Sequence, residues 1–414
     1  MANAFPKDVV VAWQESIEKF DSDNIVAKKT DVRRSSGDTQ FRGNFREWIP
    51  QSMISTTVDG LDITAELGRD VTELAVPFDI DTIPNVPFTL DAQEMNDPAM
   101  LRKKLNSAMD ALSARLNRDV VNKIVNTGAQ TVTQAGALAG YDDVAAAEEM
   151  LLRQDISSTM AKTLAMNMRD YRTAAGDLAS RTLDNSKSLG AFERSFIGDV
   201  AGFDSFRTSF MPSLALAAGA ATATGAQSHV PVANATTNGT TVPIDNRFFN
   251  LVVSSSAGMK TGDRFTAGVN EVSLINKVDT GELRTFTVTG VVDGTNITIS
   301  PAPIDFAGAT QAEVEYGNVS GPIANAQALT FLNTTTAQVN CFWEEDSIAI
   351  NAGNLAVEDL GGVNTMTDTT DSGVKLVIAN SGVLGSFTNQ YRLTGFWGVT
   401  NKDPLKNGIL LANQ

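Results

Sequence analysis

The chain has 414 residues, of which 42% are hydrophobic and 19% charged, so it has enough apolar material for a sizeable core. Its 48 acidic and 32 basic side chains give a net charge of −16, which argues against a dedicated nucleic-acid binder with a basic surface. One cysteine (Cys341) and one histidine (His229) exclude an internal disulfide, a cysteine-based metal site and a two-histidine zinc motif.

The N-terminal segment is predicted to form a short amphipathic helix over residues 7–20. Its apolar stripe contains Val9, Val10, Trp13, Ile17 and Phe20 along one side. A helix of this length is marginal alone, so the stripe needs a partner, which either the chain's own body or a neighbouring subunit supplies. The N-terminus lacks a signal-peptide pattern, and no run reaches the ~18–20 apolar residues that span a bilayer. We therefore expect a protein that folds in a reducing cytoplasm.

Residues 28–46 form a local basic patch in an acidic chain. The patch is predicted to be a solvated face, a surface that meets acidic side chains on another copy, or, third, a nucleic-acid contact, for which it has few interleaved aromatic residues. Its basic residues are Lys28, Lys29, Arg33, Arg34, Arg42 and Arg46. Residues 49–76 are then predicted to form two extended arms around a polar tip, and such an excursion has little to pack against by itself.

The central stretch 97–128 predicts one long helix. Asp97 can cap the first amide groups, Pro98 fits the first helical position, and Gly128 is expected to end the helix in a left-handed conformation. One face is apolar, with Leu101, Leu105, Ala108, Met109, Leu112, Leu116, Val120 and Ile124. Another face is charged and mainly basic, with Lys103, Lys104, Arg115, Arg118, Asp119 and Lys123.

A second helix is expected to be capped by Asp142 or Asp143, and the chain changes character near Gly225. From there β-forming residues cluster between Asn-Gly, Lys-Thr-Gly-Asp and Asp-Gly-Thr turns, with predicted strands over 242–254, 285–292 and 296–300. We expect a self-contained β-barrel or sandwich inserted between two halves of another domain. A further strand is predicted over 374–380.

The candidates for chemistry in this sequence favour structural roles. Glu344, Glu345 and Asp346 are consecutive, so their carboxylates point in different directions, which favours a solvated or intersubunit cluster over a metal site. Cys341 is followed by Phe342 and Trp343, which favours burial over reactivity, and His229 has no obvious acid or nucleophile beside it. We expect no catalytic residue, no cofactor and no metal.

Eight segments, in order along the chain, resemble the coat proteins of short-tailed, Salmonella-type tailed phages. The most similar ones include RRSSGDTQFRGNFREWIP, PIDNRFFNLVVSSSAGMKTGDRFTAGV and GFWGVTNKDP. Together the segments are 33–50, 168–178, 200–208, 225–232, 243–269, 291–304, 340–350 and 395–404. No single segment is a chemical signature, but eight colinear matches are hard to obtain by chance.

The resemblance implies an α+β protein with the Hong Kong 97-type capsid fold and an inserted all-β barrel (I) domain. Its parts are an N-arm (1–34), an E-loop with flanking strands (35–78), a peripheral (P) domain with spine helix 98–127 (79–135), an axial (A) domain in two parts (136–224 and 341–380), the inserted domain (225–340) and a C-terminal P-domain strand (381–414). The apolar face of the spine helix is expected to pack on the P-domain sheet, and its basic face to meet a neighbour's acidic surface or the shell interior. In the family the inserted domain is thought to aid folding and to reach a neighbouring capsomer through a loop, here 234–247.

The function implied is that of a major capsid protein that assembles into pentamers and hexamers of an icosahedral shell around double-stranded DNA, in the virion and, before that, in the bacterial host cytoplasm. The implied partners are other copies of the chain, a scaffolding protein, a portal protein and packaged DNA in weak non-specific contact, with no membrane. Autocatalytic crosslinking, known in one branch of the fold, is not expected, because residues 49–76 contain no lysine.

The resemblance also suggests where subunits and scaffold bind. Glu15 and Glu18 are expected to hold a basic scaffold segment. The expected subunit-interface residues are Arg33, Arg34, Arg42, Arg46, Trp48, Asp59, Asp62, Glu66, Arg69, Asn238, Asp245 and Arg247. Two alternatives stay open at this point: the shell protein of a cellular, encapsulin-like nanocompartment, and a carbohydrate-binding surface protein built on the β-rich half.

Overall fold

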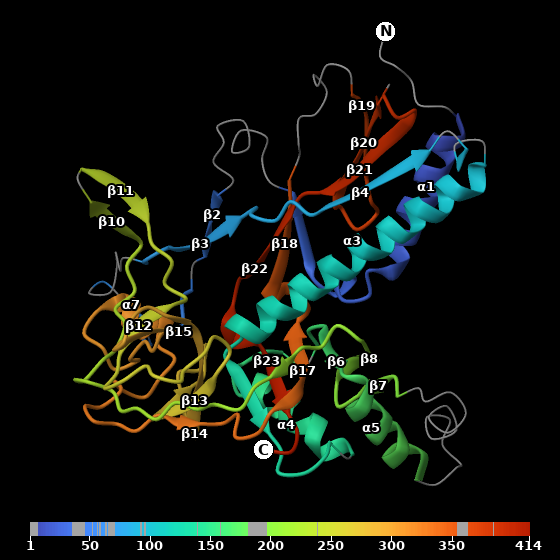
Figure 1. Ribbon diagram of the computed structural model, residues 1–414. Coiled ribbons are helices and arrows are strands. Elements are labelled where there is room, and N and C mark those ends of the chain that lie inside the picture. The colour runs from blue at the N-terminus through green and yellow to red at the C-terminus, as the bar shows by residue number, and fades with distance from the viewer. Residues whose placement is uncertain are drawn as a thin grey trace. The chain divides into compact units, whose positions relative to one another are not determined.

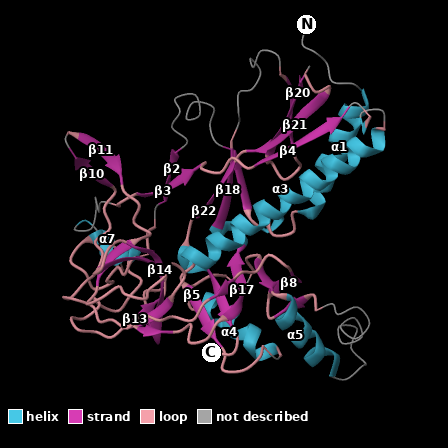
Figure 2. Cartoon of the chain, in the orientation of Figure 1, coloured by secondary structure: helices cyan, strands magenta, loops and turns pink. Residues whose placement is uncertain are grey.

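The computed structural model describes residues 7–34, 46–51, 53–55, 57, 59–62, 64, 71–91, 93–94, 97–138, 140–157, 159–180, 197–237, 239–353, 363–383 and 385–414. These residues form an α+β fold of helices and several separate sheets (Figures 1 and 2), as the resemblance implies. The chain divides into two compact units, each built from segments far apart in the sequence. The first unit contains residues 1–47, 78–120 and 348–400, and the second contains 48–77, 121–347 and 401–414.

Two sheets give the first unit its framework. An antiparallel sheet has the order β19 (Asn364–Thr369), β20 (Lys375–Val383), β21 (Thr388–Gly395) and β4 (Asn85–Asp91), and a three-stranded sheet has the order β1 (Asp31–Arg34), β18 (Ile348–Ala352) and β22 (Trp397–Asn401). Across β4 and β21, the rings of Phe88 and Tyr391 stack with their centroids 5.1 Å apart. The strand predicted over 374–380 is β20.

The two helices predicted first along the chain lie against each other in this unit (Figure 1). They are α1 (Lys7–Asp23) and α3 (Pro98–Thr127), and a short 3₁₀ helix (Ala27–Lys29) follows α1. Asp97 accepts a 2.9 Å hydrogen bond from the amide of Ala99, which confirms the predicted cap. Asn117 of α3 is fully buried and accepts hydrogen bonds from the amides of Val26 and Ala27, at 3.0 and 3.2 Å. The predicted apolar faces of both helices are buried, except that Val10 of α1 is only half-buried.

A mixed sheet organises the centre of the second unit. Its order is β5 (Gln130–Thr133), β23 (Asn407–Leu411), β17 (Ala337–Glu344), β6 (Lys162–Met166), β8 (Phe203–Arg207) and β7 (Asp199–Val200), with β9 (Ser213–Leu214) paired to β17. The helices α4 (Tyr141–Leu152) and α5 (Met168–Ser180) share one hydrophobic core with this sheet, which includes Leu151, Tyr171 and Phe342. Two 3₁₀ helices, Glu345–Ser347 and Pro404–Lys406, flank its strands.

Residues 221–331, here called the β-insertion, have a core of their own in the second unit. Their sheet has the order β12 (Phe249–Val252), β15 (Asn296–Ser300), β14 (Asp279–Val291), β13 (Arg264–Val272) and β16 (Thr330–Phe331). The hairpin β10 (Asn234–Thr237) and β11 (Thr240–Pro243) and the short helix α7 (Gln311–Tyr316) belong to the same region. The alternation of apolar residues along the strands brings Phe265 and Phe286 together, with ring centroids 5.6 Å apart. A separate two-stranded sheet pairs β2 (Arg46–Gln51) with β3 (Leu74–Asp79).

Two local predictions are wrong. The residue before α4 is Gly140, which has no side chain to cap with, so Asp142 and Asp143 lie in the first turn, where their charges favour the helix N-terminus. The φ angle of Gly128 is not positive, so this residue does not end α3 in a left-handed conformation. A Cβ there would lie 2.7 Å from both Asn407 Oδ1 and the Ile124 carbonyl, so close packing is the reason for glycine.

Within the described part of the chain, no helix is long and apolar enough to cross a membrane.

Candidate subunit interfaces

The predicted interface residues of the first unit are engaged within the chain. Arg33 pairs with Asp31 at 2.7 Å and lies over the ring of Phe78. Arg46 makes two hydrogen bonds to Asp79, of 2.5 and 2.8 Å, and both side chains are well exposed, so the pair contributes little stability. The backbone of Arg34 pairs in β1 opposite Ala352.

The loop between β2 and β3 carries exposed carboxylates. Asp59 and Asp62 are exposed, and Trp48, within β2, is half-buried. The side chain of Thr64 donates to Asp62 and, with the Thr64 amide, lowers the pKa of that carboxyl. The predicted interface residues Arg42, Glu66, Arg69 and Asn238 lie outside the described residues.

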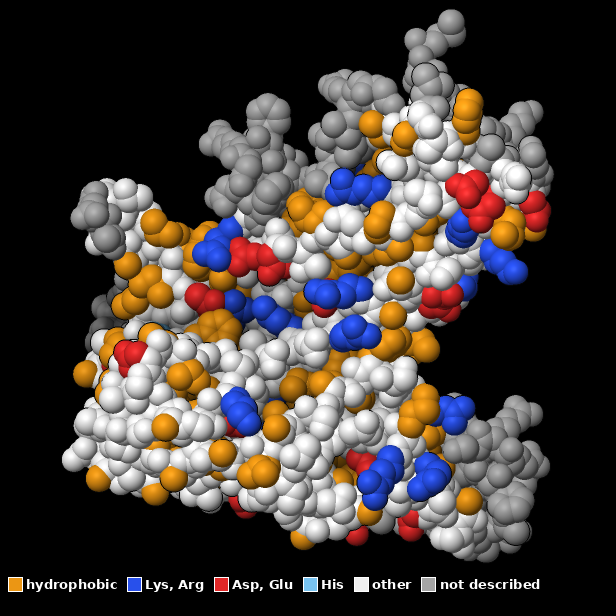
Figure 3. All heavy atoms as spheres, viewed as in Figure 1, with side chains coloured by type: hydrophobic (Ala, Val, Ile, Leu, Met, Phe, Trp, Pro, Cys, Tyr) orange, Lys and Arg blue, Asp and Glu red, His pale blue; other side chains and the backbone are white. Residues whose placement is uncertain are grey.

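The hairpin β10–β11 is polar, and the charged residues beside it bind each other. Thr236 and Thr241 lie opposite each other, with their hydroxyls 3.0 Å apart. Arg247 pairs with Asp245 at 2.6 Å, donates to the carbonyl of Asn401 and lies over the ring of Phe248. Figure 3 shows that the surface over the β-insertion is largely uncharged on the face in view. The hairpin therefore offers hydroxyl groups rather than charged groups to a partner.

The N-terminal helix exposes both carboxylates that are expected to bind a scaffolding protein. Glu15 and Glu18 are exposed on α1, and Glu15 Oε2 lies 3.4 Å from Arg102 Nε. The basic face of α3 is partly used within the chain, because Lys104 pairs with Glu94 at 2.6 Å and Arg115 pairs with Asp119 at 2.9 Å.

Sequence reasoning missed the way in which the β-insertion covers the C-terminal end of α3. The last carbonyls of a helix have no partner within it and need other donors. Here side chains of β13, β14 and β15 supply them: Arg264 Nη2 donates to Val125 at 2.6 Å, Ser300 to Thr127 at 2.8 Å, Thr287 to Gly128 at 2.6 Å and Thr285 to Ala129 at 2.7 Å. The only signal in the sequence is the presence of Arg and Thr among the inward-facing residues of apolar strands.

Burial shifts the pKa values of two groups near the C-terminal end of α3. The Arg264 guanidinium is fully buried, and burial lowers its pKa to about 9, so it stays protonated at neutral pH. A cation at this position is favourable because the C-terminal end of a helix carries partial negative charge. Burial raises the pKa of the Cys341 thiol to about 12, which keeps that thiol protonated and unreactive.

The other residues considered for chemistry have structural contacts. His229 Nε2 lies 3.0 Å from Asn246 Oδ1, and burial lowers the pKa of the imidazole. Burial raises the pKa of Glu344, whereas Asp346 pairs with Lys402. Among the described residues, no group of three or more His, Cys, Asp or Glu could hold a metal ion.

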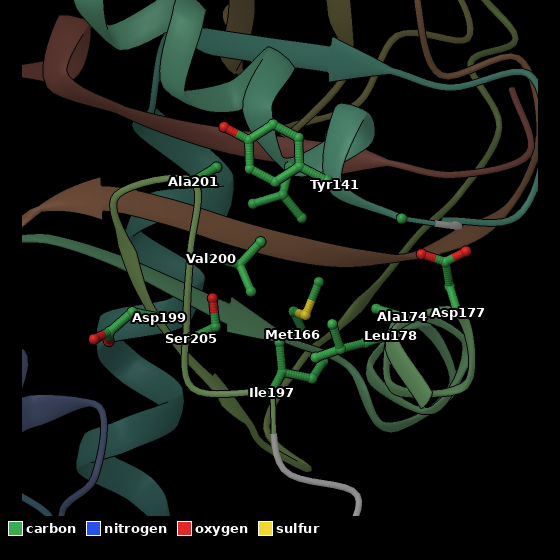
Figure 4. A pocket seen from close by; sticks show the side chains of 12 residues that line it. Tyr141, Met166, Ala174, Asp177, Leu178, Ile197, Asp199, Val200, Ala201 and Ser205 are labelled. Atoms are coloured by element: carbon green, nitrogen blue, oxygen red, sulfur yellow. The ribbon is translucent and has the colours of Figure 1, made fainter. Parts of the chain in front are cut away.

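One cavity of about 290 Å³ lies between α4, α5 and the strands β6 and β8 (Figure 4). Its lining is mainly apolar, with Val144, Met166 and Leu178 among the residues that face it. The carboxylates of Asp177 and Asp199 lie on opposite sides of it in Figure 4.

The comparison with protein families agrees with the segment resemblance. The family model described as "P22 coat protein - gene protein 5" matches residues 1–412. Among solved structures, the capsid of cyanophage P-SCSP1u is 10% identical with a TM-score of 0.47, over 93% of this chain and 86% of that one. The CUS-3 coat protein I-domain is 35% identical with a TM-score of 0.23, over 28% of this chain and 95% of that one. A virus-like particle from Pyrococcus furiosus is 10% identical with a TM-score of 0.41, over 98% of both chains.

Proposed function

The chain belongs to the P22 coat protein family, and from this premise we propose how its surfaces build a shell. It is the major capsid protein of a tailed bacteriophage, with the Hong Kong 97-type capsid fold, and it self-assembles into the icosahedral shell of the virion. The family match favours this function over a nanocompartment shell or a carbohydrate-binding surface protein. Within the family we propose assembly through pentamers and hexamers, in the host cytoplasm, by a chain whose role is structural and not catalytic.

One structural observation carries the proposal that subunits hold each other by extended arms. The sheets β2–β3 and β10–β11 each contain only two strands among the described residues. A two-stranded ribbon is marginally stable at best in water, so each needs another surface to rest on. Copies in a closed shell repeat every such contact by symmetry, which makes small contacts sufficient. We assign the loop between β2 and β3 to overlap with an adjacent subunit, and the hairpin to a contact between capsomers.

The side chains proposed for these contacts fall into two groups. Asp59 and Asp62 are exposed and can pair with the basic residues 28–46 of another copy. At the hairpin, Asp245 and Arg247 already bind each other, so the exposed Thr and Asn groups are the better donors and acceptors. The remaining proposed interface residues are Arg33, Arg34, Arg42, Arg46, Trp48, Glu66, Arg69 and Asn238. The domain boundaries expected from the sequence stay part of this proposal.

The proposed partners besides the chain itself are a scaffolding protein, a portal protein and double-stranded DNA. Glu15 and Glu18 are exposed on α1 and suit a basic scaffold segment. A net charge of −16 suits a wall that touches DNA weakly, because strong binding to phosphate would impede filling and ejection.

Electron microscopy of the full chain, expressed with and without a scaffolding protein, tests this function. Closed shells, tubes or capsomers are expected, and a stable small monomer under all conditions would overturn it. Thr240→Lys, which places a charge on the exposed hairpin, is expected to weaken the shells. Thr261→Lys, at an exposed turn of the same region outside the hairpin, is the matched control and is expected to assemble like the unmodified chain.

A further inference from the structure

The helix α7 of the β-insertion holds both arms of the loop that joins β2 and β3. Glu315 contacts Ser55, which is 260 positions earlier in the sequence, and Tyr316 contacts Thr72, which is 244 positions earlier. All these residues belong to the second unit. The loop is the segment proposed above to overlap an adjacent subunit, so the inference rests on that proposed function.

Glu315 binds the outgoing arm of the loop, the arm that follows β2 and contains Met53 and Ser55. Its side chain is almost fully buried, and one carboxylate oxygen accepts hydrogen bonds from the backbone amide of Ser55 and, at 3.0 Å, from the Ser55 hydroxyl. The other oxygen accepts a 2.6 Å hydrogen bond from Gln311, one turn earlier in α7. A buried carboxylate with several donors is held in one orientation, because losing any of them leaves a buried acceptor unpaired.

Tyr316, the next residue, bridges the two arms. Its hydroxyl accepts a 3.1 Å hydrogen bond from the amide of Met53 in the outgoing arm and donates at 2.8 Å to the carbonyl of Thr72 in the returning arm. One hydroxyl therefore fixes the separation of the two arms at their base.

The helix that carries these two residues is itself anchored. Thr310 and Glu313 form a capping box at its N-terminus, and Lys277 Nζ donates a 2.9 Å hydrogen bond to the carbonyl of Gly317 at its C-terminal end. Lys277 is half-buried and interacts electrostatically with Glu315. A six-residue helix without such anchors would not give its side chains a fixed direction.

We propose that α7 sets the direction in which the two arms leave the subunit at Ser55 and Thr72, and that Glu315 and Tyr316 are positioning residues for the overlap with a neighbouring subunit. The β-insertion then controls the geometry of an assembly contact made by a different part of the chain. Pre-orienting the loop lowers the entropy lost when a neighbour binds it, which favours assembly.

Amide hydrogen exchange of the full-length unassembled protein tests the contact directly. Glu315→Ala is expected to speed exchange of the Ser55 amide about tenfold, and Tyr316→Phe that of the Met53 amide by a similar factor, because each variant removes the acceptor of that amide. Glu315→Gln keeps an acceptor and is expected to lie between the original chain and Glu315→Ala. The controls are Glu282→Gln and Tyr141→Phe, at exposed side chains of the same unit.

The readouts separate positioning from general loss of structure. Amides of β13, β14 and β15 are expected to keep their exchange rates in all variants; faster exchange throughout the β-insertion, or no change at Ser55 and Met53, would overturn the proposal. Shell assembly, followed by light scattering, is expected to slow for Glu315→Ala and to recover in part for Glu315→Gln. Assembly of Glu315→Ala at the original rate would overturn the positioning role, whereas failure of the original chain to assemble would instead overturn the proposed function.

Discussion

Arg264 donates a 2.6 Å hydrogen bond to the backbone carbonyl of Val125, in the last turn of α3, across 139 positions of sequence. The guanidinium is fully buried, and its second terminal nitrogen, Nη1, donates to the carbonyl of Gly128 and to the hydroxyl of Thr287. The end of the long helix is therefore closed by the β-insertion and not by residues next to it in the chain. This gives a concrete physical basis for the expectation that the inserted domain supports folding of the subunit.

Replacing Arg264 by Met is expected to lower the free energy of unfolding by about 2–4 kcal/mol, because the variant leaves the buried Val125 carbonyl without a donor. Urea unfolding of the unassembled subunit measures this. Arg172→Met, on the exposed side of α5, is the control and is expected to change the free energy of unfolding by less than about 0.5 kcal/mol. Equal losses in the two variants would show that the helix end does not depend on Arg264.

Gly128→Ala is expected to destabilise the subunit by about 1–3 kcal/mol, because the added Cβ would lie 2.7 Å from Asn407 Oδ1 and from the Ile124 carbonyl. Gly136→Ala is the matched control, since a Cβ there would meet nothing within 4 Å. Thermal unfolding of both variants under one set of conditions makes the comparison. A neutral result for Gly128→Ala would contradict the close approach described here.

His229 is expected to make the subunit less stable at mildly acidic pH. Burial lowers the pKa of its imidazole, so the unfolded chain binds a proton more readily than the folded one. The contribution of His229 is then fully present above the unfolded pKa of about 6.5 and is lost as the pH falls below it. Unfolding free energies between pH 7.5 and 5 are compared for the original chain and His229→Gln. Because this is the only histidine, the difference between the two curves isolates it, and parallel curves would disprove the effect.

Reversing the two carboxylates of α1, by Glu15→Lys with Glu18→Lys, is expected to slow scaffold-dependent assembly, most strongly at low salt, where charges are least screened. Glu15 also pairs with Arg102, so Glu18→Lys alone tests the scaffold contact without disturbing that pair. Arg102→Gln is the complementary control, because it removes the pair and keeps both carboxylates. Unchanged assembly of the double variant at low and moderate salt would exclude the proposed scaffold contact.

The sequence alone determined the elements whose causes are local. The apolar stripes of α1 and α3 recur at helical spacing, and apart from the half-buried Val10 both faces are buried as predicted. The cap at Asp97 follows from one residue and its neighbours in the chain. The change to β-forming residues and turns after Gly225 likewise predicted a region with its own core. Eight colinear segments were enough to indicate the family.

Only the tertiary structure decided which distant residues meet. Three contacts join residues more than 100 positions apart: the hydrogen bonds to the end of α3, the hydrogen bonds between Ser55 and Glu315, and the close packing of Asn407 against Gly128. Propensity and periodicity describe neighbours in sequence, whereas these contacts depend on how strands from separate segments pack. Gly128 is an example. Its position at the end of a helix predicted a left-handed turn, whereas in the structure the backbone of Ile124 and the side chain of Asn407 leave no room for a Cβ.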